Sequence, residues 1–556
     1  MPDLVLATLN AKYIHASFGL RYLMANLGAL RERAEIAEFD INQRPLEIVE
    51  RILALAPRLV GFGVYIWNVV ETTEVVAALK RIAPEICIVL GGPEVSYETE
   101  GQEIVALADH VITGEADLTF ATIAADLLAG KSHAKIIPAL LPKLEQIAYP
   151  YDLYTDHDLA HRVIYVEASR GCPFTCEFCL SSLDIPVRAF ALEPFLGQMK
   201  RLLERGARQF KFVDRTFNLH LPTSSAILQF FLDHWIDGMF VHFEMIPDRL
   251  PEQLRTLIAK FPPGALQFEV GIQTFDDLAS KNISRRQNYQ RLADNFHYLR
   301  GSTGVHIHAD LIVGLPGEGI ESFGRGFDQL IALRPQEIQI GILKRLRGTP
   351  IVRHDAEYSM AYAPRPPYEI LQTRDIPFAD MQRMRRFARY WDLLGNSGNF
   401  ADTLPLAWSA SGDRSGAFLS PVGRVATSAI AADAATGLRK APLPDAAAET
   451  AVLISPFTQM LALSDWLWSH LRRTHEIALL SLAEALHTFL IEQVKVPAAT
   501  VAAALIRDWQ RIGRKGVPAF LETPETLQVA KRLQPKRQAR HLSAGAEPEA
   551  FTIKLD

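Results

Sequence analysis

Cysteine is scarce in this chain, which has only four among 556 residues. So few cannot build a disulfide framework, and we expect a reducing, cytoplasmic setting in which clustered cysteines bind metal or carry out redox chemistry. The sequence also has no run of 18 or more apolar residues, so no membrane-spanning helix is expected. Its first residues, MPDLVLATLN, lack a basic segment before the apolar ones, so no signal peptide is expected.

Positive charge is not in excess either. The 58 lysines and arginines are outnumbered by 63 aspartates and glutamates, which gives a net charge of −5. This balance argues against a broad surface for nucleic acid or for membranes. Apolar residues make up 49% of the chain, enough for a core in each of the three or four domains that the length suggests.

Residues 1–132 alternate between short apolar runs and longer amphipathic stretches, a pattern typical of parallel strands joined by helices. Five strands are predicted, at Asp3–Leu9, Ala34–Asp40, Leu59–Ile66, Ile86–Glu94 and His110–Asp117. A helix is predicted over Phe18–Ala34. We expect a doubly wound, Rossmann-like sheet that binds its ligand at the carboxyl ends of the strands. Residues 133–162 have no clear period and predict a linker.

The alternation resumes over residues 163–350. Six strands are predicted there, at Val163–Gly171, Gln209–Asp214, Met239–Ile246, Leu266–Thr274, Val305–Leu315 and Glu337–Leu346. Such a unit is a second open sheet or part of a barrel. Strands are predicted to stop after Thr349, and residues 351–556 to form a mainly helical domain. Its segment 409–437 is rich in small residues and predicts a loop.

Three of the four cysteines lie in one short segment, ASRGCPFTCEFCLSS, as Cys172, Cys176 and Cys179. Three thiolates on one loop suit a zinc ion with an open position, or a four-iron cluster with one iron free of protein ligands. A structural zinc site needs a fourth ligand, for which His220 and His242 are the candidates. The iron cluster needs no further ligand.

The order of a strand, GCPFTCEFC and a strand–helix alternation resembles the radical S-adenosylmethionine (SAM) superfamily. The resemblance implies a partial (β/α)6 barrel over residues 163–350 and a 4Fe-4S cluster held by the three cysteines. The free iron then binds SAM, whose reductive cleavage gives a 5′-deoxyadenosyl radical. It also implies an electron donor such as flavodoxin or ferredoxin as a partner.

The resemblance assigns SAM contacts to seven residues: Phe178, Asp214, Glu269, Gln273, Thr274, Gly314 and Pro316. Phe178, just before the third cysteine, is expected to lie against adenine. The segment FVDRTFN stands where many relatives have a Gly-Gly-Glu run that grips the SAM amino group. Since that run is absent, Asp214 or Arg215 has to serve.

The glycines of the first domain follow its third, fourth and fifth strands, and no G-x-G-x-x-G follows the first. This distribution resembles the cobalamin-binding domain that precedes many radical SAM domains. The implied cobalamin contacts are His15, Gly61, Gly63, Trp67, Asn68, Gly91, Gly92, Gly114 and Glu115. His15 departs from the Asp-x-His-x-x-Gly pattern of cobalt ligands in spacing and in partner. Both a His15-ligated cobalt and a cobalamin without a ligand from the protein stay open.

The combined resemblance predicts a cobalamin-dependent radical SAM enzyme that transfers a methyl group to an unactivated carbon of an unknown substrate. Rearrangement, cyclisation or oxidation with the same cofactors is the alternative within the enzyme class. Outside that class, a non-catalytic corrinoid or iron–sulfur carrier and a zinc-binding structural module stay open. Residues from 351 onward resemble an uncharacterised C-terminal region found in a subset of these proteins. The basic run 531–540 is interpreted as a solvated face.

Overall fold

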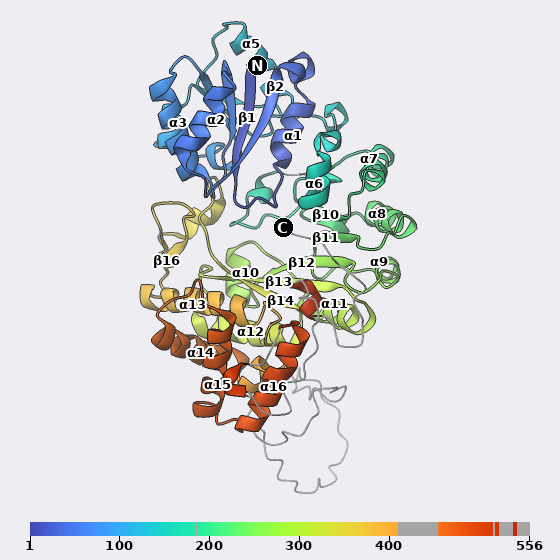
Figure 1. Ribbon diagram of the computed structural model, residues 1–556, viewed down its shortest axis with the longest axis vertical. Coiled ribbons are helices and arrows are strands. Elements are labelled where there is room, and N and C mark those ends of the chain that lie inside the picture. Colours follow the sequence, from blue (N-terminus) through green and yellow to red (C-terminus); the bar gives the residue numbers. More distant parts are fainter. Residues whose placement is uncertain (185, 410–453, 515–517, 522–536, 542–556) are drawn as a thin grey trace, which may run out of the picture.

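The computed structural model describes residues 1–184, 186–409, 454–514, 518–521 and 537–541. Its three parts follow one another along the long axis of the molecule (Figure 1). An N-terminal α/β domain lies at one end, a strand-rich domain in the middle, and a group of helices at the other end. No helix among the described residues is long and apolar enough to cross a membrane.

The N-terminal domain is a six-stranded parallel sheet in the order β2-β1-β3-β4-β5-β6. Its strands are β1 (Leu4–Asn10), β2 (Ala34–Asp40), β3 (Leu59–Gly63), β4 (Cys87–Gly91), β5 (His110–Thr113) and β6 (Ile136–Pro138). The five predicted strands are confirmed, and β6 adds a sixth from within the predicted linker. The chain reverses its direction of travel across the sheet between β1 and β3, the kind of point at which such sheets bind ligands.

Five helices cover this sheet: α1 (Phe18–Ala25), α2 (Pro45–Ala54), α3 (Val69–Ile82), α4 (Glu103–Leu107) and α5 (Thr119–Leu128). Two separate buried clusters, one with residues of α2 to α4 and one with residues of α1 and α5, show that both faces of the sheet are covered. The predicted helix over Phe18–Ala34 is wrong in length. It ends at Ala25, and a 3-10 helix over Gly28–Arg33 follows, starting with Gly28 at a φ of +57°.

The central domain is a second six-stranded parallel sheet, in the order β14-β13-β12-β11-β10-β7. Its strands are β7 (Ile164–Val166), β10 (Gln209–Phe212), β11 (Phe240–Met245), β12 (Leu266–Gln273), β13 (His306–Val313) and β14 (Glu337–Ile342). Because β7 and β14 do not pair, the predicted partial (β/α)6 barrel is confirmed as an open one. Residues of β12 alternate between buried and half-buried, so apolar side chains face the helices and polar ones face the interior.

The barrel's helices are α7 (Leu192–Glu204), α8 (Leu221–Asp233), α9 (Glu252–Ile258), α10 (Asp277–Asn282), α11 (Tyr289–Ser302) and α12 (Ile320–Leu333). A short helix, α6 (Asp156–His161), precedes it. A two-stranded ribbon of β8 (Ser169–Arg170) and β9 (Arg188–Ala189) flanks the cysteine segment. The ribbon fixes both ends of the loop that carries the cysteines.

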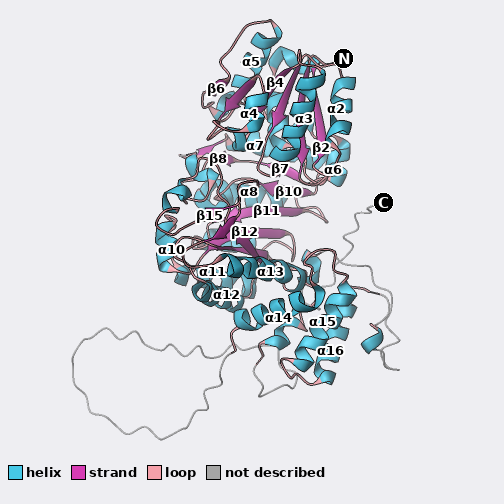
Figure 2. Ribbon diagram, turned by 90° about the vertical axis from the view of Figure 1, so that its left-hand side faces the viewer, coloured by secondary structure: helices cyan, strands magenta, loops and turns pink. Residues whose placement is uncertain are grey.

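Helices dominate the C-terminal part: α13 (Phe378–Leu394), α14 (Pro456–Leu471), α15 (Leu479–Glu492) and α16 (Ala498–Arg511). They lie at the end of the molecule opposite the N-terminal domain (Figure 2) and share one apolar core with the barrel. The prediction that strands stop after Thr349 is wrong, because β15 (Ala361–Tyr362) and β16 (Ile370–Gln372) form a short hairpin. Of the predicted loop 409–437 only Ser409 lies within the described residues, and of the basic run 531–540 only 537–540.

Candidate functional site

The three clustered cysteines line a cavity of about 260 Å³ beside the carboxyl ends of β11 and β12; we call it the cysteine cavity. Cys172 and Cys176 are buried, and Cys179 is half-buried. Gly171 makes the turn into this loop possible. Its φ is +90°, and a Cβ there would lie 2.7 Å from the carbonyl oxygen of Asp184.

Two arginines, Arg285 and Arg215, line the cavity together with the thiols. Arg285 donates a 3.4 Å hydrogen bond from Nη1 to the Sγ atom of Cys176. Arg215 lines the same cavity and forms a 2.9 Å ion pair with Glu244. Burial raises the pKa of Cys172, and the neighbouring thiols raise it further, so an additional positive centre is needed to hold this thiol as a thiolate.

The donor set fits an iron–sulfur cluster. It consists of three cysteines on one loop, and neither His220 nor His242 lines the cavity with them. Within the described residues, no group of three His, Cys, Asp or Glu is arranged to hold a single metal ion. Three thiolates around a cavity that also has room for a small molecule are what a cluster with one open iron requires.

Three of the predicted SAM contacts, Phe178, Glu269 and Gln273, line the cysteine cavity. Gln273 has a φ of +73°, a conformation that costs a non-glycine residue free energy and is often found at functional sites. The Oε2 atom of Glu269 also lies 3.2 Å from Nε2 of His242. These three remain predictions as SAM ligands, and they lie where that role requires.

The other four predicted SAM contacts do not line this cavity. Asp214 accepts hydrogen bonds from the backbone N–H of Ala168 and the hydroxyl of Ser169, at 3.0 and 2.6 Å. The hydroxyl of Thr274 donates to Glu318 at 2.7 Å. Gly314 faces away, since a Cβ there would lie 2.7 Å from Ile370. The carbonyl oxygen of Pro316 accepts from Asn282. These four stay predictions as SAM contacts.

Arg285 and Asp310 are among the residues of this cavity that sequence reasoning missed. Burial raises the pKa of Asp310 well above its usual range, and the carboxylates of Glu269 and Glu244 raise it further. Its Oδ1 atom is buried without a hydrogen-bond partner among the described residues. Asp310 stands in the segment DLIVGLPGE, whose strand position was available from the sequence. Arg285 follows a short helix and had no such signal.

A second cavity of about 380 Å³ lies between the N-terminal domain and the barrel; we call it the interdomain cavity. Six of the predicted cobalamin contacts line it: Gly61, Gly63, Gly91, Gly92, Gly114 and Glu115. They lie in or just after β3, β4 and β5. Glycine keeps this surface free of side chains: a Cβ on Gly61 would lie 2.9 Å from the Phe120 ring, and one on Gly92 2.4 Å from the carbonyl oxygen of Val64.

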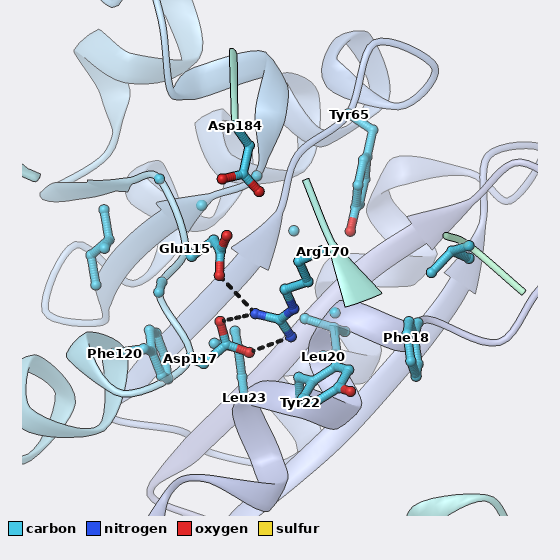
Figure 3. A pocket seen from close by; sticks show the side chains of 18 of the residues that line it. Phe18, Leu20, Tyr22, Leu23, Tyr65, Glu115, Asp117, Phe120, Arg170 and Asp184 are labelled. Atoms are coloured by element: carbon cyan, nitrogen blue, oxygen red, sulfur yellow. Dashed lines mark hydrogen bonds and ion pairs between the residues drawn. The ribbon is translucent and has the colours of Figure 1, made fainter. Parts of the chain in front are cut away.

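Arg170, which the sequence did not reveal, lies at the boundary of the interdomain cavity (Figure 3). It donates hydrogen bonds to Glu115 and Asp117 at 2.9 Å each, and to Glu167 at 2.9 Å. Its guanidinium also lies over the Tyr22 ring, 4.6 Å from the centroid. Because Arg170 is two residues before Cys172, this network joins the N-terminal domain directly to the cysteine loop.

The remaining three predicted cobalamin contacts do not line the interdomain cavity. His15 has its Nδ1 atom 2.6 Å from the hydroxyl of Tyr165. Asn68 is fully buried, and its side chain bonds the backbone of Tyr65, Leu9 and Gly63. Trp67 stacks on Tyr65, whose ring does line the cavity.

The two cavities are neighbours, because Ser181 and Arg215 line both of them. Ligands bound in each would therefore meet at a shared boundary inside one molecule. Of these two shared residues, Arg215 is the charged one.

Three family models match the chain, in the order of its three parts. Residues 4–124 match the B12 binding domain, and residues 166–330 match the Radical SAM superfamily. Residues 356–420 match a family described as a protein of unknown function, DUF4080. The matches confirm the predicted cofactors: cobalamin for the first domain, and a 4Fe-4S cluster with SAM for the second.

Curated relatives are distant and cover part of the chain. An uncharacterized methyltransferase of Pyrococcus horikoshii is 28% identical over 228 residues, 36% of this chain and 49% of the relative. The ribosomal protein uS12 methylthiotransferase RimO of Pelobacter propionicus is 23% identical over 34% of this chain and 43% of its own. The 2-(S-pantetheinyl)-carbapenam-3-carboxylate methyltransferase of Streptantibioticus cattleyicolor is 22% identical over 55% of this chain and 50% of the relative. The chain thus spans about half the length of the curated relatives it matches.

Among solved structures, the radical S-adenosylmethionine methyltransferase TsrM from Kitasatospora setae has a similar fold. The complex with tryptophan and a SAM analogue has a TM-score of 0.52 at 16% identity, over 64% of this chain and 76% of the other. The form with cobalamin and a [4Fe-4S] cluster has a TM-score of 0.51 at 17% identity, over 64% and 75%. The match confirms the predicted succession of an α/β domain and a partial barrel.

Proposed function

We propose that this chain, a radical SAM protein with an N-terminal B12-binding domain, transfers a methyl group from SAM to a carbon of its substrate with the help of cobalamin. The observation that carries the proposal is the shared boundary of the two cavities at Ser181 and Arg215. Methyl transfer through cobalamin requires that SAM and the corrinoid lie within one enclosed site. The methyltransferase relatives support the same reaction class.

Each cofactor has residues suited to it. Cys172, Cys176 and Cys179 would hold the cluster, and the glycines after β3, β4 and β5 would leave room for the corrinoid. When bound, a 4Fe-4S cluster supplies an electron for SAM cleavage, and cobalamin supplies a transferable methyl group. The protein's own contribution is to bind, to orient and to exclude water.

Three ionisable side chains of the cysteine cavity have separate tasks. Arg285 stabilises the thiolate of Cys176, to which it donates a hydrogen bond. Arg215, paired with Glu244, keeps a positive charge at the boundary of the two cavities. Asp310, with a raised pKa and an Oδ1 atom that has no hydrogen-bond partner among the described residues and lies 3.8 Å from Nε2 of His308, is able to bind a hydroxyl or ammonium group of SAM.

Oxygen-free purification after cluster assembly, followed by iron, sulfide and cobalt analysis, tests both cofactors at once. We expect about four iron atoms per chain. Cys176→Ala should lose most of the iron and all SAM cleavage. Cys87→Ala is the matched control, because Cys87 lies in β4 and burial raises the pKa of its thiol to about 11. Full iron content in Cys176→Ala, or a wild-type protein without cobalt, contradicts the proposal.

Product analysis separates the reaction classes. A radical methyl transfer yields both S-adenosylhomocysteine and 5′-deoxyadenosine, whereas rearrangement, cyclisation or oxidation yields 5′-deoxyadenosine alone. A carrier yields neither and leaves the cluster spectrum unchanged when SAM is added.

We also propose a cytoplasmic location with flavodoxin or ferredoxin as the reductant. This proposal predicts that reduced flavodoxin supports SAM cleavage in place of a chemical reductant.

A further inference from the structure

The segment that follows β14 touches the loops of both cavities. Residues 345–368, which we call the bracket, run from the end of the barrel into the family region of unknown function. In Figure 1 the part of the chain around β16, which follows the bracket, lies between the N-terminal domain and the barrel. The bracket is therefore placed to contact both.

One end of the bracket binds the loop after β4. Glu94 follows Gly91 and Gly92 of the interdomain cavity, and its side chain is only 3% exposed. Its Oε1 atom accepts hydrogen bonds from Nε of Arg347 at 2.9 Å and from the hydroxyl of Tyr368 at 2.8 Å. Arg347 also donates to Tyr368, which closes a triangle. The side chains of Glu94, Arg347 and Tyr368 are thus hydrogen-bonded to one another around the buried carboxylate of Glu94. Such a network holds both the position and the orientation of the loop after β4.

The contact continues along the same loop. Glu98 accepts hydrogen bonds from both terminal nitrogens of Arg345, at 3.0 and 3.2 Å, and from the backbone N–H of Gly348 at 3.1 Å. Gly348 has a φ of +80°, and a Cβ there would lie 2.4 Å from the Tyr97 ring. The bracket backbone thus packs directly on the loop, which leaves little freedom to slide.

The middle of the bracket binds the cysteine loop. Glu177 lies between Cys176 and Cys179, and its side chain is 3% exposed. It accepts hydrogen bonds from His354 at 2.9 Å and from Arg353, and its carbonyl oxygen accepts from the backbone N–H of Ile351 at 3.0 Å. A buried carboxylate inside the cysteine motif is thus held by the bracket through both side-chain and main-chain bonds.

We propose that the bracket fixes the loop after β4 relative to the cysteine loop, and that Glu94, Arg347, Tyr368, Glu177 and His354 are its positioning residues. The bracket thereby sets the separation of the interdomain and cysteine cavities. The effect of the bracket on methyl transfer rests on the proposed function. The contact by which the bracket links the two loops does not. The link also assigns a structural role to residues 356–368, the start of the region of unknown function.

Hydrogen exchange of the full chain without cofactors tests the link. Tyr368→Phe removes one hydroxyl at the first end, and His354→Ala removes one partner of Glu177 in the middle. We expect exchange to rise about fivefold in the loop nearest each change, the effect of one lost hydrogen bond. If the loops are linked, the far loop also exchanges faster, by about twofold. The peptides to follow cover residues 91–98 and 172–179.

Asp152→Asn is the matched control, because it breaks an exposed 2.9 Å ion pair with Arg31 away from both loops. It should leave both peptides unchanged. Should Tyr368→Phe and His354→Ala each change only the nearer loop, or neither loop, the bracket is not a link. The exchange measurement needs no cofactor, so it can be made even on a wild-type protein that takes up no cobalt. The proposed link and the proposed function can therefore fail independently of each other.

The loaded protein gives a second readout, the distance between two paramagnetic centres. With the cluster reduced and cobalamin in its cob(II)alamin form, pulsed electron paramagnetic resonance reports their separation. We expect one narrow distance in the wild type and a broadened distribution in Tyr368→Phe at unchanged iron and cobalt content. A distribution as narrow as that of the wild type overturns the proposal.

Discussion

At the scale of single residues, Gly92 is a position where an added methyl group would clash with the backbone. Its φ is +109°, and a Cβ would lie 2.4 Å from the carbonyl oxygen of Val64, a backbone atom that cannot move aside. We expect Gly92→Ala to lower the free energy of unfolding by about 1–3 kcal/mol. Denaturant unfolding measures this loss.

Gly197→Ala is the control for this substitution. Gly197 is an exposed residue in the middle of α7, and a Cβ there would meet no neighbouring side chain within 4 Å. Alanine there should raise the free energy of unfolding by about 0.5–1 kcal/mol, because glycine is the poorer helix former. Equal effects of the two substitutions would contradict the steric argument for Gly92.

The raised pKa of Glu318 makes the free energy of unfolding depend on pH. Its side chain is buried at 2% exposure, and burial raises its pKa to about 8, although the bond from Thr274 lowers it in part. The unfolded chain releases this proton near its ordinary pKa of 4.5, whereas the folded chain keeps it until about 8. The folded state therefore binds more protons between these values, and the free energy of unfolding falls as the pH rises through this window.

We expect the urea midpoint to fall between pH 5 and pH 8 in the wild type and to fall less in Glu318→Gln. Glutamine is neutral throughout this range and accepts the same hydrogen bond from Thr274. All other titrating groups are shared, so the difference between the two proteins reports Glu318 alone. Identical slopes in the two proteins would show that Glu318 titrates normally.

Which single residues the sequence could reveal follows from their chemistry. The glycines at the ends of β3, β4 and β5 line one cavity, as predicted, because a parallel sheet brings the ends of its strands to one edge. Arg170 and Arg285 were missed because arginine is common and neither position has a distinctive pattern around it. Asn68 stays a prediction as a cobalamin contact, since a polar residue after a strand has the same sequence pattern whether it binds a ligand or, as Asn68 does, bonds the backbone.

At the scale of elements, α14 depends on a residue of another helix. Asp328 in α12 accepts hydrogen bonds from the hydroxyl of Ser455 and from the backbone N–H of Phe457, at 2.5 and 2.7 Å. It therefore satisfies one of the free N–H groups at the start of α14 and holds the hydroxyl of Ser455, which accepts from the N–H of Thr458 at 3.1 Å. We expect Asp328→Ala to lower the free energy of unfolding by about 1–2 kcal/mol, as measured by thermal or denaturant unfolding.

Asp294→Ala provides the comparison. Asp294 is an exposed residue of α11 that accepts a hydrogen bond from Gln290 one turn earlier. Such a pair contributes about 0.2–0.5 kcal/mol. If Asp328→Ala costs no more than this, the capping of α14 by α12 is of no energetic importance.

The long strands were predictable, and some of the shortest were not. The strands β11, β12 and β13 have six to eight residues, enough for an alternating pattern to be recognised. β6, with three residues, and β15, with two, are too short to have a period. Their strand conformation comes from a neighbour: β6 pairs with β5, and β15 pairs with β16.

At the scale of the whole molecule, Arg170 holds two domains together. Its side chain is 12% exposed, and it neutralises Asp117 of the N-terminal domain and Glu167 of the barrel, at 8% and 9% exposure. Removing one partner leaves buried charges uncompensated. We expect Arg170→Gln to cost about 3–5 kcal/mol and to separate the unfolding of the two domains into distinct transitions in calorimetry.

Arg31→Gln is the control at this scale, because its partner Asp152 and Arg31 itself are both exposed. An exposed pair contributes about 0–1 kcal/mol. A calorimetric profile of Arg170→Gln that matches the profile of Arg31→Gln would mean that the domains are joined by other contacts.

The hydrogen bond between Arg347 and Glu94 joins residues 253 positions apart. During synthesis the N-terminal domain leaves the ribosome and can fold long before Arg347 has been made. The loop after β4 therefore lacks its contacts with the bracket until β14 and the residues that follow it have been synthesised. A truncated product that ends before the bracket would contain both sheets and all three cysteines, and would still lack the part that sets them in register.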